Sequence, residues 1–103
     1  MNKEILKEYT KTIILNILKQ KDSSGYDISK KIEEYKVNIE SSDLYLALKR
    51  MEKNNLISSC WIETKEIRIK KYTITQEGKE YLKNKKKEWN NNKVILDKLL
   101  GVK

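Results

Sequence analysis

The first twenty residues repeat apolar side chains at intervals of three and four, the spacing of an amphipathic helix. This pattern predicts a helix over residues 2–20 with one continuous apolar side. That side is broad for a single small domain, so we expect part of it to meet a second subunit. Its members are Ile5, Leu6, Tyr9, Ile13, Ile14, Ile17 and Leu18.

A second helix is predicted over residues 25–35. Ser24 and Asp27 have the spacing of a capping box, in which each side chain binds a free amide at the start of the helix. Ile28, Ile32 and Tyr35 follow at helical intervals and are expected to face inward. Residues 36–40 then form a short connector.

The third predicted helix, residues 42–53, has two contrasting sides. Its apolar residues share one side and predict a buried stripe of Leu44, Ala47, Leu48 and Met51. The opposite side carries Ser42, Leu46, Lys49 and Lys53, with Tyr45 and Arg50 on its flanks. The hydroxyls of Ser41 and Ser42 are expected to cap the start of this helix.

Two strands are predicted after it, over residues 57–62 and 67–74, because both stretches are rich in β-forming residues. Alternation places Arg68 and Lys70 on the same face as Tyr72 and Ile74. The tip between the strands, residues 64–66, lacks the glycine that a tight hairpin prefers. We therefore expect either a turn longer than two residues or a mobile tip.

The last predicted helix spans residues 76–100, with Thr75 as its N-terminal cap and Gly101 closing it. It is long for a chain of this size and carries large apolar residues that its own domain cannot cover. A partner helix from a second copy is the simplest cover. These residues are Trp89, Ile95, Leu96, Leu99 and Leu100.

Together these elements predict a mainly α fold with a small β-wing. It is a winged helix-turn-helix: a three-helix core, a two-stranded wing and a long C-terminal helix. We expect residues 1–75 to form a DNA-binding domain and residues 76–103 to form a dimerisation helix within the same compact unit. In this layout the third helix can enter a major groove while the wing flanks the phosphates.

The charge distribution favours a polyanionic partner. The 103 residues carry a net charge of +8. Residues 1–40 hold 8 basic and 7 acidic side chains, residues 41–75 hold 7 and 4, and residues 76–103 hold 8 and 4. The excess thus begins at the third helix. Taken alone, the charge is also compatible with a lysine-rich genome bias.

Several functional classes are disfavoured by composition. The chain has no histidine and one cysteine, Cys60, which rules out a Cys/His metal site and predicts a small semi-buried hydrophobe in the first strand. Its three glycines are too far apart for a phosphate loop. No apolar run approaches the roughly 18 residues of a membrane span, and the N-terminus does not resemble a signal peptide. We expect a cytoplasmic protein without cofactor, metal or enzymatic activity.

The chain resembles the PadR family of winged-helix transcriptional regulators over nearly its whole length. The matching segments are Ser24-Gly25-Tyr26-Asp27-Ile28, Asp43-Leu44-Tyr45-Leu46-Ala47-Leu48-Lys49-Arg50-Met51-Glu52, Leu56-Ile57-Ser58 and Arg68-Ile69-Lys70-Lys71-Tyr72-Thr73-Ile74-Thr75-Gln76-Glu77-Gly78. The resemblance implies a homodimer held by the first and last helices on a near-palindromic operator, as in the small subgroup with one C-terminal helix. In multidrug-sensing members of that subgroup a tryptophan lines a central pore. Trp89 falls at that place, which implies either a planar aromatic effector or a simple filler of the dimer core.

Two segments depart from the family pattern. Ser42-Asp43 replaces the usual Gly-Thr or Gly-Ser, and a carboxylate there repels phosphates although it can accept from cytosine. The wing lacks the usual Gly-Arg-Arg turn and has Lys65-Glu66-Ile67-Arg68-Ile69. Its isoleucines are candidates for the sugar edges of a minor groove, with Arg68 or Lys70 reaching inside.

The function expected from these observations is sequence-specific binding of double-stranded DNA by a dimeric repressor. One alternative is an accessory DNA-binding protein of a plasmid or mobile element, and another is a protein–protein interaction scaffold. Tyr45 is either a phosphate contact or a half-buried packing residue, and Arg50 either contacts DNA or pairs with Glu33 or Glu40. The candidate DNA contacts are Ser41, Ser42, Tyr45, Leu46, Lys49, Lys53, Lys65, Arg68 and Lys70. The candidates for the dimer interface or ligand pore are Ile5, Tyr9, Trp89, Leu96 and Leu99.

Overall fold

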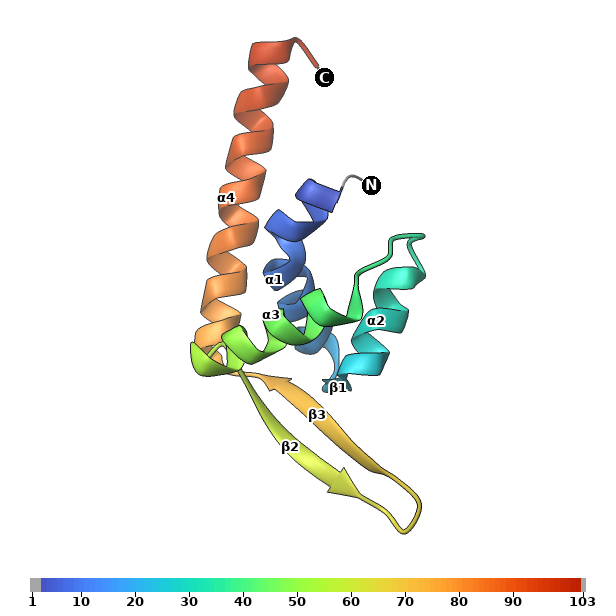
Figure 1. Ribbon diagram of the computed structural model, residues 1–103. Coiled ribbons are helices and arrows are strands. Elements are labelled where there is room, and N and C mark those ends of the chain that lie inside the picture. Colours follow the sequence, from blue (N-terminus) through green and yellow to red (C-terminus); the bar gives the residue numbers. More distant parts are fainter. Residues whose placement is uncertain (1–2, 103) are drawn as a thin grey trace.

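The computed structural model describes residues 3–102 and shows a helical body from which a β-hairpin and a long helix extend (Figure 1). The elements in chain order are α1 (Lys3–Gln20), β1 (Ser23–Ser24), α2 (Gly25–Glu33), α3 (Ser41–Lys53), β2 (Ile57–Glu63), β3 (Arg68–Ile74) and α4 (Gln76–Leu100). This is the predicted winged helix-turn-helix. The hairpin β2–β3 is its wing.

One apolar core joins the first three helices to the base of the wing. The predicted buried stripe of α3 is confirmed for Leu44, Leu48 and Met51, with Ala47 partly buried. In α1 the pattern missed Leu15, which is fully buried. The other buried members are Ile14, Leu15, Leu18, Ile28, Ile32, Leu56, Ile57, Tyr72, Ile74 and Leu82.

Helix α2 begins as predicted but ends earlier. The Ser24 hydroxyl accepts a hydrogen bond from the Asp27 amide at 3.1 Å, which caps the first turn. The expectation that Tyr35 faces inward is wrong, because α2 ends at Glu33 and the Tyr35 side chain is 75% exposed. The chain leaves the helix through Lys36, whose φ of 57° turns the backbone away from the helical path.

Helix α3 starts one residue before the predicted position, and its cap differs. Glu40 is the N-cap residue and makes no side-chain capping bond, while Ser41 and Ser42 already lie inside the first turn. The predicted serine caps are therefore wrong. Asp43 in that turn still complements the positive end of the helix dipole.

The sheet has a third strand that the sequence pattern did not indicate. β1 pairs antiparallel with β3, placing Ser23 opposite Tyr72 and Ser24 opposite Lys71, so the order is β1-β3-β2. A strand of two serines has no hydrophobic alternation by which it could be recognised. Ser24 therefore serves both as a strand residue and as the cap of α2.

The wing tip is a turn of more than two residues, as the missing glycine predicted. The Thr64 amide donates to the Ile67 carbonyl at 2.8 Å, and the Thr64 hydroxyl accepts from the amides of Glu66 and Ile67. Cys60, expected to be semi-buried, is exposed. The β2–β3 hairpin, which contains Cys60, extends beyond the helical body (Figure 1).

Helix α4 begins at a tight junction with the wing. The Thr75 hydroxyl accepts from the Gly78 amide at 3.0 Å, and the Thr75 amide donates to the Leu56 carbonyl at 3.1 Å. Gly78 has no Cβ, which allows its backbone to approach that same carbonyl. Gly101 ends the helix with φ 69°, as predicted.

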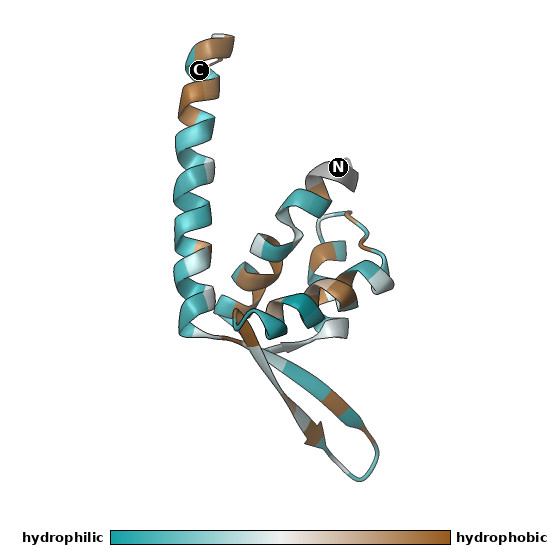
Figure 2. Ribbon diagram, turned by 60° about the vertical axis from the view of Figure 1, so that its left-hand side comes forward, coloured by the Kyte–Doolittle hydropathy of each residue, from teal (hydrophilic) through white to brown (hydrophobic). Residues whose placement is uncertain are grey.

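Only the first part of α4 packs on the body. Leu82 is buried, and the Lys86 ammonium donates to the Asn16 side chain of α1 at 2.6 Å. The far end projects past the other elements, and Figure 2 shows a hydrophilic middle followed by an apolar end. The apolar residues there are the exposed Val94, Ile95, Leu96, Leu99 and Leu100.

Candidate nucleic-acid interface

The outer side of α3 is exposed over its whole length, as its sequence pattern predicted. Leu44, Leu48 and Met51 anchor the inner side in the core, and the 3.6-residue period then turns Ser42, Leu46, Lys49 and Lys53 outward. Ser41 is exposed beside them at the start of the helix. This side offers hydroxyls, two ammonium groups and one apolar side chain, the groups that contact base edges and phosphates in a major groove.

Tyr45 combines the two roles considered for it. Its side chain is 51% exposed. Its ring lies so close to the first residue of α2 that a Cβ built on Gly25 would be 2.6 Å from the Tyr45 hydroxyl oxygen. Tyr45 therefore packs α3 against α2 and still presents part of its ring and its hydroxyl to the outside.

Arg68 and Lys70 lie on the same face of β3 as Tyr72, as predicted, and an aromatic residue of β2 joins them. The Arg68 guanidinium lies 4.2 Å from the centre of the Trp61 ring, and the Lys70 ammonium lies 5.9 Å from it. Lys70 is also 5.5 Å from the centre of the Tyr72 ring. We call this face of the wing, formed by Ser59, Trp61, Glu63, Arg68, Lys70 and Tyr72, the inner face.

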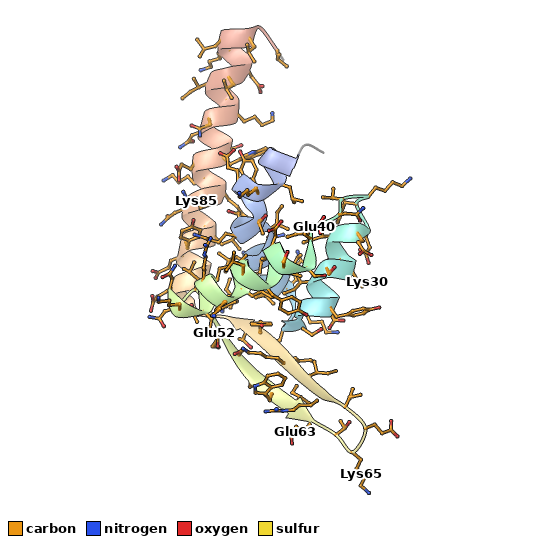
Figure 3. The ribbon with its side chains drawn as sticks, in the orientation of Figure 1. Lys30, Glu40, Glu52, Glu63, Lys65 and Lys85 are labelled. Atoms are coloured by element: carbon orange, nitrogen blue, oxygen red, sulfur yellow. The ribbon has the colours of Figure 1, made fainter. Side chains whose placement is uncertain are left out.

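Glu52 connects α3 to the inner face. Its carboxylate accepts a hydrogen bond from the Ser59 hydroxyl at 2.5 Å and lies 3.5 Å from the Lys70 ammonium. In Figure 3 Glu52 is labelled where the end of α3 meets the base of the wing. Burial, followed by the negative charge of Glu52, raises the pKa of the Tyr72 phenol above its ordinary 10.0.

A cleft of about 630 Å³ joins three of the predicted contacts. Tyr45 of α3 and Arg68 and Lys70 of the wing line it together with the start of α2. The other α3 candidates lie on the exposed side of the helix and do not line this cleft. Lys65 stands apart at the wing tip and points away from the body (Figure 3). Arg50 is exposed and forms no ion pair with Glu33 or Glu40, its suggested partners; Glu33 pairs with Lys30 instead.

The sequence pattern did not single out Trp61 or Glu52. A usable signal existed for Trp61, since alternation from the buried Ile57 places Ser59, Trp61 and Glu63 on one face of β2. The register that brings Trp61 opposite Lys70 needs the paired strands. Glu52 had no such signal, because its partners are seven and eighteen positions away in the chain.

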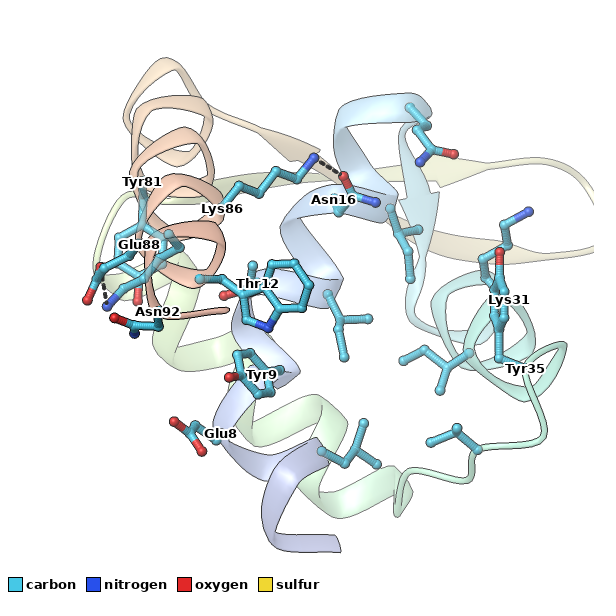
Figure 4. A pocket seen from close by; sticks show the side chains of 18 residues that line it. Glu8, Tyr9, Thr12, Asn16, Lys31, Tyr35, Tyr81, Lys86, Glu88 and Asn92 are labelled. Carbon is cyan, nitrogen blue, oxygen red and sulfur yellow. Dashed lines mark hydrogen bonds and ion pairs between the residues drawn. The ribbon is translucent and has the colours of Figure 1, made fainter. Parts of the chain in front are cut away.

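Two residues of the second predicted group, Tyr9 and Trp89, line a separate groove between α1, α4 and the end of α2. The groove has a volume of about 820 Å³, and its lining includes Tyr9, Ile13, Tyr81 and Trp89 (Figure 4). Leu96 and Leu99 lie farther along α4, do not line the groove, and are 51% and 76% exposed. The side chain of Ile5 lies outside the described part of the structure.

Comparison with known proteins identifies the family. Residues 14–84 match the model of the transcriptional regulator PadR-like family. The chain belongs to this family. The match covers the end of α1, all of α2 and α3, the whole wing and the start of α4, so it includes every element of the candidate interface. None of the helices within residues 3–102 has the length and apolar character needed to cross a membrane.

Solved structures agree with the assignment to PadR-like regulators. The chain is 39% identical to a PadR family transcription regulator from Clostridium difficile R20291, with a TM-score of 0.83 over 89% of this chain and 98% of that one. It is equally 39% identical to a transcriptional regulator from Clostridium thermocellum, with a TM-score of 0.86 over 95% of this chain and 96% of the other. Bacillus subtilis PadR in complex with operator DNA is 29% identical, with a TM-score of 0.66 over 73% of this chain and 45% of that larger protein.

Proposed function

We propose that this protein is a dimeric transcriptional repressor that binds specific duplex DNA through α3 and the wing. One observation carries the proposal: Tyr45 of the recognition helix and Arg68 and Lys70 of the wing line a single cleft. Because α3 and the wing line the same cleft, they can contact the same partner molecule. The structure of Bacillus subtilis PadR with operator DNA, a relative of 29% identity, supports duplex DNA as that partner.

Within this proposal α3 reads the major groove. The groove is about 12 Å wide and admits one helix. Lys49 and Lys53 are placed to neutralise phosphates or contact guanine, Ser41 and Ser42 to donate or accept hydrogen bonds, and Leu46 to contact a thymine methyl group. Lys65 at the exposed wing tip supplies a further cation to the flanking backbone.

The dimer is proposed from the apolar surface that one copy leaves exposed. Trp89, Leu96 and Leu99 on α4 are 50%, 51% and 76% exposed, and an apolar strip of this kind is stabilised when a second copy buries it. Tyr9, Ile13 and Ile17 of α1 are partly buried and line the groove beside α4, so they would meet the same interface. Ile5 is proposed for it from the sequence pattern alone. A two-fold dimer carries two copies of α3 and so fits a near-palindromic operator. Repression would follow from occupancy of a promoter.

A planar aromatic effector is proposed for the groove that contains Tyr9, Tyr81 and Trp89. Three aromatic rings in one groove offer flat faces on which a planar ligand can stack, and such faces attract a cation. The charged groups of the lining have both signs, because Glu8 and Glu88 are accompanied by Lys31, Lys85 and Lys86. The test titrates a planar cationic dye into a Trp61→Phe variant, in which Trp89 is the remaining tryptophan. Quenching of its emission is expected. An unchanged spectrum would leave Trp89 as a filler of the dimer core.

DNA recognition is tested by selecting bound duplexes from a random pool with the wild type and with Lys49→Ala. The matched control is Lys83→Ala, which removes an exposed lysine of α4. We expect the wild type to enrich a near-palindrome and to bind it more weakly as salt rises. Lys49→Ala should weaken binding by about tenfold, the loss of one good phosphate or base contact, and Lys83→Ala should not. No binding at moderate salt, or binding indifferent to salt, would favour an interaction scaffold.

A further inference from the structure

The inner face of the wing holds one arginine in a defined position. In the β2–β3 register Glu63 lies opposite Arg68, and Trp61 lies opposite Lys70. The Nε atom of Arg68 is 2.8 Å from Oε1 of Glu63, and its guanidinium carbon is 4.2 Å from the centre of the Trp61 ring. The Glu63 carboxylate therefore pairs with the Nε end of the guanidinium, and the Trp61 ring lies against the guanidinium carbon.

The terminal nitrogens of Arg68 remain for an outside acceptor. No hydrogen bond within residues 3–102 engages them, and the side chain as a whole is exposed at the cleft that Tyr45 and Lys70 also line. The two terminal nitrogens form a planar fork that matches the oxygens of a phosphate. A phosphate bound there would lie between the wing and α3, where the backbone bordering a helix-filled major groove passes.

This position favours a different contact from insertion into a minor groove, which the sequence analysis suggested for Arg68 or Lys70. An inserted arginine must extend away from its strand to reach the groove floor. A guanidinium paired with Glu63 and stacked on Trp61 can extend only by losing both contacts. The observed geometry thus suits a contact made at the level of the backbone.

We propose that Trp61 is a positioning residue that holds Arg68 as a preformed clamp for one DNA phosphate. The proposal rests on the proposed function and adds the way in which the wing contributes to it. A free arginine loses much side-chain entropy when it binds a phosphate, whereas Arg68 is already ordered on the indole ring. The affinity gained through Trp61 therefore depends on Arg68 being present.

The test is a double-mutant cycle on the duplex selected by the wild type. Trp61→Leu keeps apolar bulk but removes the aromatic face, Trp61→Phe keeps a face, and each is combined with Arg68→Ala. Cys60→Ala, exposed on the opposite face of β2, is the matched control. Dissociation constants are measured at several salt concentrations, and urea unfolding verifies that each variant remains folded. Trp61 is 52% exposed, so these changes leave the core intact.

Arg68→Ala should weaken binding about tenfold on every duplex and reduce the slope of log K against log salt by about 1, as loss of a phosphate contact does. Trp61→Leu should weaken binding by about fivefold, within the range of cation–π stacking. Trp61→Phe and Cys60→Ala should lie within about twofold of the wild type. The Trp61→Leu/Arg68→Ala double variant should bind no more weakly than Arg68→Ala alone.

The possible failures are distinguishable. If the wild type binds no duplex, the proposed function is wrong and this inference falls with it. If the wild type binds but the Trp61→Leu and Arg68→Ala effects multiply, Trp61 does not act through Arg68. If Arg68→Ala changes the preferred bases beside the operator, Arg68 reads a groove and the phosphate clamp is wrong, while the proposed function stands.

Discussion

The Ser59 hydroxyl of β2 donates a hydrogen bond to Oε2 of Glu52 in the last turns of α3, at 2.5 Å. The other oxygen of the same carboxylate lies 3.5 Å from the Lys70 ammonium of β3. One side chain of α3 thus contacts both strands of the wing. A polar contact therefore adds to the apolar core in holding the wing against α3.

The Glu52 contact predicts a difference between two substitutions. Glu52→Gln keeps an oxygen that accepts from Ser59, whereas Glu52→Ala removes it; both remove the charge. We expect Glu52→Ala to lower the free energy of unfolding by about 1 kcal/mol more than Glu52→Gln, the net value of one hydrogen bond. The Glu52→Ala variant should also bind DNA more weakly than Glu52→Gln, because the wing is no longer held in one orientation relative to α3. Urea unfolding and DNA titration measure both effects, and equal DNA affinities would show that the contact does not orient the wing.

The two buried glycines should respond differently to alanine. A Cβ at Gly78 would overlap the backbone carbonyl of Leu56, which the core and Thr75 hold in place. At Gly25 the overlap is with the side chain of Tyr45, which is half exposed and can rotate away. We expect Gly78→Ala to destabilise the protein by at least about 2 kcal/mol, in the range of overpacked cores, and Gly25→Ala to cost less. Urea unfolding compares them. A smaller loss at Gly78 than at Gly25 would contradict the packing described for the wing–α4 junction.

Tyr72 predicts a loss of stability in alkali. Burial and the charge of Glu52 raise the pKa of its phenol above 10.0 in the folded protein. As the pH rises, the Tyr72 phenol therefore loses its proton in the unfolded chain before it does so in the folded protein. The contribution of Tyr72 to the free energy of unfolding is complete below pH 10.0 and is lost as the pH rises through the pKa of the folded protein. Tyr72→Phe should flatten the fall in unfolding free energy between about pH 9 and pH 11, the range around an ordinary phenol pKa. Identical pH profiles for the two proteins would show that Tyr72 ionises alike in both states.

The end of α4 predicts a change in oligomeric state. Leu96→Asp combined with Leu99→Asp places two charges in the strip that we propose a second copy buries. Sedimentation should show a dimer for the wild type and a dissociation constant raised by at least about a hundredfold in the variant, since each unpaired buried charge costs more than 1.4 kcal/mol. Asn90→Asp with Asn91→Asp adds the same charge to exposed α4 positions and is the control. A wild type that is monomeric at micromolar concentration would contradict the proposed dimer.

The elements themselves followed from local patterns. Apolar residues at intervals of three and four identified α1 and α3, and Ser24, Thr75 and Gly101 marked helix ends because a cap is made by residues within one turn of it. The resemblance to PadR regulators, confirmed by the match over residues 14–84, named the fold and the family. The predicted burial was wrong for Tyr35 and Cys60, which are both exposed, because a local pattern does not show whether another element packs over a side chain. Tyr35 lies after the end of α2, and Cys60 lies in the wing.

The sequence by itself determined the helices, the core that they share and the cationic character of the second half of the chain. Only the tertiary structure decided which polar groups of α3 and the wing meet. Glu52 reaches Ser59 and Lys70, and Trp61 supports Arg68, because strand register and the packing of α3 bring together residues that no helical or strand period relates. Periodicity assigns a side chain to a face of its own element. What stands opposite that face depends on how distant segments pack.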